Sequence, residues 1–147
     1  MQHRNRRLMA PLVVAGLALA ACHQKAATPA KIKPATVEHV EGSELARVRL
    51  TERAAQRLDI QTAAAREVAT TRSGRRMVVP YAAVLYDARG DTWVYTNPES
   101  LVYVRHAIRV DYIDGDQAVL AEGPPAGTQV VTVGGQELFG AEFEIGH

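Results

Sequence analysis

The stretch from residue 77 to residue 96 constrains the fold of this chain most strongly. It consists of two apolar runs, MVVPYAAVLY and TWVYT, separated by the polar residues 87–91. Both runs carry the β-branched and aromatic residues, and the two-residue alternation, that are typical of strands. Gly90 supplies the positive φ that a short loop requires, so we predict a β-hairpin. At Pro80 we predict a strand edge, a bulge or a bend between two strands. Because an isolated hairpin is marginally stable in water, flanking segments must cover it.

Strands are also predicted after this hairpin, where the chain has its longest alternation. One face of that alternation holds Val102, Val104, His106, Ile108, Val110 and Tyr112, and a polar outer face holds Tyr103, Arg105, Arg109 and Asp111. A strand of this length is expected to contain a bulge or a bend, since strands typically have about five or six residues.

Shorter segments complete the predicted fold. We expect strands at residues 47–50, 118–121, 128–133 and 142–145, an extended segment at 60–68, a loop at 70–76, a helix at 51–59 with Thr51 as its N-cap, and one helical turn at 136–139. Closely spaced short strands with Gly, Pro and Asp turns predict a mainly β fold, a small β-barrel or sandwich of antiparallel strands with one short helix.

The N-terminal residues 1–21 have the pattern of a secretory signal peptide. Three arginines, Arg4, Arg6 and Arg7, precede an apolar run of 14 residues, 8–21. A basic start followed by about 7–15 apolar residues is typical of such signals. The run is shorter than the roughly 20 residues that cross a bilayer as a helix.

The end of this run predicts a lipid anchor. Leu19, Ala20 and Ala21 with Cys22 resemble the lipobox of bacterial lipoproteins, in which the cysteine receives a diacylglycerol and becomes the new N-terminus. Cys22 is the only cysteine, so it is a free thiol, an intermolecular bridge or a modified residue. Its position favours the lipid-modified cysteine, which would hold the chain at a membrane through its acyl chains.

Composition divides the remainder into two parts. Residues 22–43 are rich in Ala, Pro, Lys and Thr and predict a flexible linker, so the folded domain is expected at residues 44–147. Removal of residues 1–21 leaves 14 basic residues against 16 acidic ones. We therefore expect no nucleic-acid partner, because the domain carries no basic stripe.

The remaining side chains predict neither a catalytic nor a metal-binding site. His106 is open to two interpretations, a ligand or pH-sensitive group and the more common structural strand histidine. Asp111, Asp114 and Asp116 lack the loop of the known calcium motif and fit Asp-Gly turns. Met77 is the only methionine after residue 21. No nucleophile motif or phosphate loop is present, so we predict neither enzymatic activity nor a cofactor or metal.

Three stretches carry a resemblance to a known family. Residues 48–68 (VRLTERAAQRLDIQTAAAREV), 79–96 and 104–138 resemble, in order and spacing, the periplasmic adaptor subunits, or membrane fusion proteins, of resistance–nodulation–division (RND) efflux pumps. The resemblance covers roughly residues 45–145. Asp59 stands where the family usually has Gly. The chain is a shortened form without the coiled-coil hairpin and lipoyl-like domain, since only about ten residues separate Val68 from Val79.

The resemblance implies a function in transport. It implies a lipid-anchored periplasmic adaptor that docks on an inner-membrane RND-type transporter, on the periplasmic side of the inner or outer membrane. The residues that contact the transporter are not indicated, and a homo-oligomer stays open. The alternative is a free-standing envelope lipoprotein that binds a small solute or another envelope protein, which the missing hairpin favours.

Overall fold

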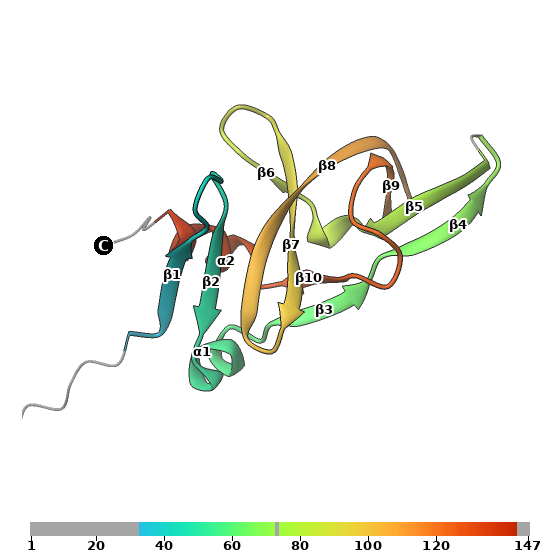
Figure 1. Ribbon diagram of the computed structural model, residues 1–147. Helices are drawn as coiled ribbons and strands as arrows, with labels where there is room; N and C mark the ends of the chain where they lie inside the picture. The colour runs from blue at the N-terminus through green and yellow to red at the C-terminus, as the bar shows by residue number, and fades with distance from the viewer. Residues whose placement is uncertain (1–32, 73, 144–147) are drawn as a thin grey trace, which may run out of the picture. The chain divides into compact units, whose positions relative to one another are not determined.

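The computed structural model describes residues 33–72 and 74–143, in which strands predominate (Figure 1). The strands of this part of the chain are β1 (Ala35–His39), β2 (Ala46–Leu50), β3 (Gln61–Ala64), β4 (Arg66–Thr70), β5 (Gly74–Pro80), β6 (Leu85–Tyr86), β7 (Thr92–Glu99), β8 (Val102–Asp114), β9 (Gln117–Glu122) and β10 (Gln129–Val133). The helices are α1 (Glu52–Arg57) and α2 (Gly135–Glu142), and η1 (Tyr81–Ala83) is a 3-10 turn. The described strand pairs are all antiparallel, so the predicted mainly β fold is confirmed.

The strands close into a barrel through one bent segment. Hydrogen-bonded strands follow the order β3-β10-β7-β8-β9-β5-β4, and Ala65 alone separates β3 from β4 in the chain. The Ala65 amide donates to the Thr128 carbonyl, and the Ala65 carbonyl accepts from the Gly127 amide, each at 2.8 Å. Ala65 is thus hydrogen-bonded to the residues just before β10, and the chain on either side of it pairs with different strands, β3 with β10 and β4 with β5. The two ends of the strand order meet, as a small barrel requires.

Strands β7 and β10 are buried on both faces. Adjacent residues of a strand point to opposite sides, so Val94 and Val130 join a core inside the barrel, whereas Tyr95 and Val131 join a second core outside it. Helices α1 and α2 and strand β2 complete this second core, with Leu138 of α2 fully buried in it. This outer layer holds α2 against β7 and β2.

The helix predicted after Thr51 is confirmed as α1. The Thr51 Oγ1 accepts a hydrogen bond from the Ala54 amide at 3.2 Å, which satisfies one of the free donors of the first turn. Past the helix, Asp59 has φ 48°, a left-handed conformation that glycine adopts most easily and aspartate tolerates. No helix within residues 33–72 and 74–143 is long and apolar enough to cross a membrane.

The hairpin predicted over residues 77–96 is confirmed only around its turn. Strand β6 pairs with the first two residues of β7, but the residues up to Pro80 belong to β5, which pairs with β4 and β9. The bend expected at Pro80 is the reason, because η1 follows it directly and turns the chain out of β5. Most of β7 pairs with β8 instead.

Strand β8 confirms the long alternation and corrects its predicted outer face. The expected irregularity is present, because the pairing with β9 shifts register between Arg109 and Val110 and again between Val110 and Tyr112. The first part of the face predicted to be polar and outer is instead buried, since Tyr103 and Arg105 are only 4% and 6% exposed. The second core covers it. The alternation of residues assigns side chains to the two faces of a strand, but it does not show whether other elements bury both faces.

The linker predicted at residues 22–43 is too long. Strand β1 lies within it and pairs with β2, so the folded part of the chain includes residues before 44. Only Ala35 and Val37 of β1 are apolar, so the local sequence indicates a strand only weakly. The pairing with β2 supplies the hydrogen-bond partner. Residues 1–32 lie outside the described part of the chain.

Two predicted segments near the ends of strands are also wrong. The loop predicted at 70–76 contains the start of β5, because Thr70 and Gly74 are already paired. The last predicted strand, 142–145, begins inside α2, whose final residue is Glu142. In the helix the Glu142 side chain reaches Tyr95 on β7 and Arg105 on β8. Residues 144 and 145 of that predicted strand lie outside the described part of the chain.

Candidate functional site: an aromatic cavity floored by a buried arginine

The predicted site residues are not brought together. Leu19, Ala20, Ala21 and Cys22 lie outside the described residues, so lipid attachment stays a prediction.

The residues considered for metal or pH chemistry are also scattered. His106 is half-buried on β8, Met77 packs against the barrel core, and Asp111, Asp114 and Asp116 are exposed near the turn between β8 and β9. Within residues 33–72 and 74–143, no three His, Cys, Asp or Glu side chains are grouped so that they could hold a metal ion.

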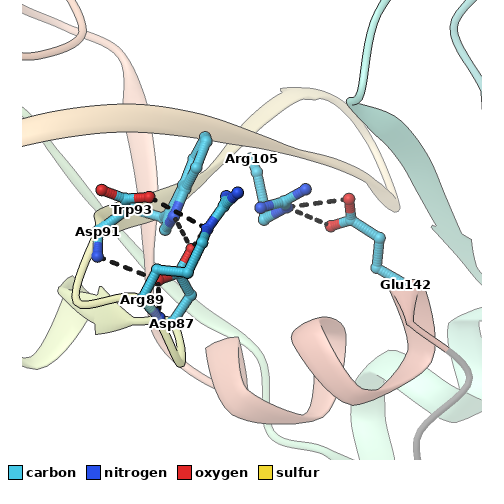
Figure 2. A network of polar contacts seen from close by, with 6 residues as sticks. All are labelled: Asp87, Arg89, Asp91, Trp93, Arg105 and Glu142. Carbon is cyan, nitrogen blue, oxygen red and sulfur yellow. Dashed lines mark hydrogen bonds and ion pairs between the residues drawn. The ribbon is translucent and has the colours of Figure 1, made fainter.

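A buried polar cluster lies instead at the contact between β7, β8 and α2. Tyr95 and Arg105 are register partners on the two strands, and Glu142 reaches both from α2. Figure 2 shows Glu142 beside Arg105. The Arg105 Nε donates to both Glu142 oxygens, at 2.9 and 2.8 Å, and the Tyr95 hydroxyl donates to Oε2. Burial and this hydrogen bond raise the pKa of Tyr95, which keeps the hydroxyl a donor. The charges compensate one another, as buried ions require.

Aromatic rings surround the Arg105 guanidinium group. Its central carbon lies 4.5 Å from the centre of the Trp93 ring, 4.8 Å from that of Phe143 and 5.9 Å from that of Phe139. The two phenylalanine rings touch each other with their centres 4.7 Å apart. A planar, delocalised cation stacks favourably on such rings, so the position of Arg105 is defined by stacking as well as by the ion pair.

The turn between β6 and β7 fixes Trp93. Asp87 Oδ1 accepts from the amides of Arg89 and Asp91, at 2.8 and 3.0 Å, and Oδ2 accepts from the Trp93 indole nitrogen at 3.2 Å (Figure 2). Burial alone would raise the pKa of Asp87, but these hydrogen bonds and the charge of Arg89 together lower it. The carboxylate therefore stays ionised and orients the indole ring over Arg105.

These groups border a cavity of about 600 Å³. It is lined by residues of the turn between β1 and β2, of the turn between β6 and β7, and of α2 and the residue after it, together with Trp93 and Arg105 on β7 and β8. A mostly apolar cavity with a few polar groups is the usual form of a small-molecule site, and 600 Å³ lies within the usual range of roughly 300–1,000 Å³.

Sequence reasoning did not identify this site. Arg105 was assigned to an exposed face and Glu142 to a strand, so their pairing across 37 positions of sequence was hidden. One signal was available, because Arg105 directly follows the apolar run from Leu101 to Val104. If the fold buries such a residue it must be paired, since arginine is almost never fully buried without a partner.

Comparison with known proteins gives one partial structural match. No family model and no curated protein matches the chain. Among solved structures, it is similar to a 180-residue fragment of SilB from Cupriavidus metallidurans CH34, determined by NMR, that encompasses the N-terminal metal-binding site and the membrane-proximal domain of that protein. The match has 24% identity and a TM-score of 0.44, and covers 53% of this chain. It spans 42% of the SilB fragment, less than half of its length.

Proposed function

We propose that this chain is a lipid-anchored periplasmic adaptor that docks on an inner-membrane transporter of the RND efflux type. The observation that carries the proposal is the resemblance of residues 48–68, 79–96 and 104–138, in order and spacing, to the adaptor family. The lipobox that ends at Cys22 supports anchoring on the periplasmic side of the envelope. Docking, rather than catalysis, is the activity that such a chain would supply.

The pairing of the strands is consistent with this proposal. The first resembling stretch supplies β3 and most of β2, and the third supplies their partners β10 and most of β8. The second stretch supplies β6 and most of β7, which pairs with both β8 and β10. One folded body therefore uses all three stretches. Adaptors of this family carry their lipoyl-like domain and coiled-coil hairpin between the first stretch and the second, where this chain passes directly from β4 to β5.

The shortened connection limits the proposed role. Between these two stretches the chain has no coiled-coil hairpin, the element that in the family reaches an outer-membrane channel. We therefore propose contact with the transporter alone, from the lipid anchor.

Affinity capture tests the proposal. The full chain, tagged at its C-terminus and captured from gently solubilised membranes, should recover an inner-membrane RND-type transporter. A matched control is Leu138→Asp, which places a carboxylate at a fully buried position of the second core and leaves the lipobox intact. This variant should stay membrane-associated and lose the transporter. Capture that yields abundant tagged chain without a transporter, or the same transporter with Leu138→Asp, would contradict docking by the folded domain.

A further inference from the structure

One edge of the Arg105 guanidinium group has no partner. Its Nε faces Glu142, but within the described part of the chain neither terminal nitrogen makes a hydrogen bond. Neither of these nitrogens is fully buried, and Arg105 lines the cavity, which is where a ligand would reach them. A guanidinium edge with two parallel N–H donors matches the two oxygens of a carboxylate.

Burial distinguishes Arg105 from an arginine on the protein surface. The Arg105 side chain is 94% buried, its faces are stacked on Trp93 and Phe143, and its inner nitrogen is held by Glu142. The group therefore loses little conformational freedom when a ligand binds, and an interaction in this partly desolvated place is stronger than in water.

Of the two arginines at the cavity, Arg105 is paired with Glu142 through Nε alone and, among the described residues, keeps both terminal nitrogens without a hydrogen bond. Arg89 also borders the cavity, but it forms ion pairs with Asp87 at 3.6 Å and Asp91 at 3.4 Å. The Asp87 carboxylate is already used by the hydrogen bonds of its own turn. Glu44, on the turn between β1 and β2, adds a negative charge at the rim, which disfavours multiply charged anions such as phosphate.

The remaining lining is apolar. Leu45, Ala88 and the rings of Trp93, Phe139 and Phe143 offer a surface for a flat hydrocarbon body next to the guanidinium edge. Because three separate segments of the chain form the walls, the cavity is concave, which suits a small molecule rather than an extended peptide.

We propose that this cavity binds a small organic monocarboxylate with a flat apolar body. Its two carboxylate oxygens accept from the terminal nitrogens of Arg105, and its body lies against the ring of Trp93. The proposal depends only on the cavity and is independent of docking on a transporter.

The single tryptophan of the chain allows a direct test. Because Trp93 borders the cavity, its fluorescence reports occupancy during titration of the full chain. Three probes separate the contributions: phenylacetate has both carboxylate and ring, 2-phenylethanol has the ring alone, and acetate has the carboxylate alone. We expect saturable binding of phenylacetate, with the alcohol and acetate each at least tenfold weaker.

Matched variants locate the binding. Arg105→Lys keeps a cation beside Glu142 but removes the two-donor edge, and it should weaken phenylacetate at least tenfold. Ala88→Phe places a bulky ring at an exposed lining position of the cavity, leaves Trp93 the single tryptophan and should abolish binding. The control is Arg109→Lys on the same strand, whose ion pair with Glu122 is exposed and outside the cavity. It should change the affinity less than twofold.

Three results would overturn the proposal. The first is binding of 2-phenylethanol as tight as that of phenylacetate, since the carboxylate would then contribute nothing. The second is unchanged affinity in both Arg105→Lys and Ala88→Phe, with thermal unfolding showing that each variant is folded. The third is acetate binding as tightly as phenylacetate, which would indicate an adventitious anion only.

Discussion

Replacing Glu142 by glutamine removes the carboxylate that compensates the charge of Arg105 and changes the shape of the side chain very little. The two side chains are 6% and 3% exposed, so water reaches the guanidinium group only from the cavity. The amide oxygen of the new side chain can still accept from Tyr95. Its amide nitrogen, in contrast, is a donor that would face the Arg105 Nε, which is also a donor.

The expected loss of stability follows from this burial. Removing one partner of a buried ion pair typically costs about 3–5 kcal/mol, because an uncompensated charge remains. Trp93 and Phe143 stack on the remaining cation, and its outer edge faces the cavity. Both features partly stabilise the uncompensated charge, so we expect the lower end of the range, about 3 kcal/mol in the free energy of unfolding.

A second ion pair on the same strand provides the control. Arg109 Nη2 lies 2.6 Å from Glu122 Oε1, but the two side chains are 65% and 71% exposed. Exposed pairs contribute only about 0.2–1 kcal/mol, so Glu122→Gln should cost no more than that. A double variant, Arg105→Met with Glu142→Leu, removes both buried charges and should be more stable than Glu142→Gln alone.

Urea unfolding measures these differences. Trp93 lies beside the cluster, and its fluorescence should follow the transition, with stability obtained by linear extrapolation. Suppose Glu142→Gln lowers the free energy of unfolding no more than Glu122→Gln does, with the same dependence on urea concentration. The buried ion pair then does not stabilise the fold by the expected amount. A double variant less stable than Glu142→Gln would show that the loss comes from packing rather than charge.

Three further outcomes are expected. Cys22→Ser should move the chain from the membrane fraction to the soluble periplasmic fraction, and fractionation with unchanged membrane association would show that another element anchors it. The raised pKa of Tyr95 means that its hydroxyl stabilises the fold fully below the unfolded pKa of about 10 and progressively less above it. The native protein should therefore lose stability between about pH 10 and pH 12, and Tyr95→Phe should lose less over the same range. Urea unfolding at each pH measures the difference. Gly134→Ala should cost more stability than Gly90→Ala in thermal unfolding: both glycines have positive φ, 89° and 87°, but a Cβ at Gly134 would lie 2.2 Å from the Ile60 Cδ1, whereas Gly90 has open space.

Local chemistry predicted several elements correctly. The N-cap at Thr51, the strand that became β8 with its irregularity, and the bend at Pro80 follow from side-chain periodicity, capping and the missing proline donor. These features depend on residues close together in the chain, which is why the sequence alone predicts them.

The predictions failed where pairing partners are distant in sequence. The arm before Pro80 reads as half of a hairpin, but its hydrogen bonds go to β4 and β9 rather than β7. Strand β1 has too few apolar residues to be recognised before β2 provides a partner. In both cases the local pattern permits a strand and leaves its neighbour undefined.

The mainly β character and the turns were already present in the order of residues, because alternation and turn chemistry act over two to six positions. The candidate site was not, because it requires Tyr95 and Arg105 to be opposite each other on paired strands and α2 to bring Glu142 over them. A guanidinium group becomes a binding element there only because folding removes most of its water, stacks rings on its faces and leaves one edge open to the cavity.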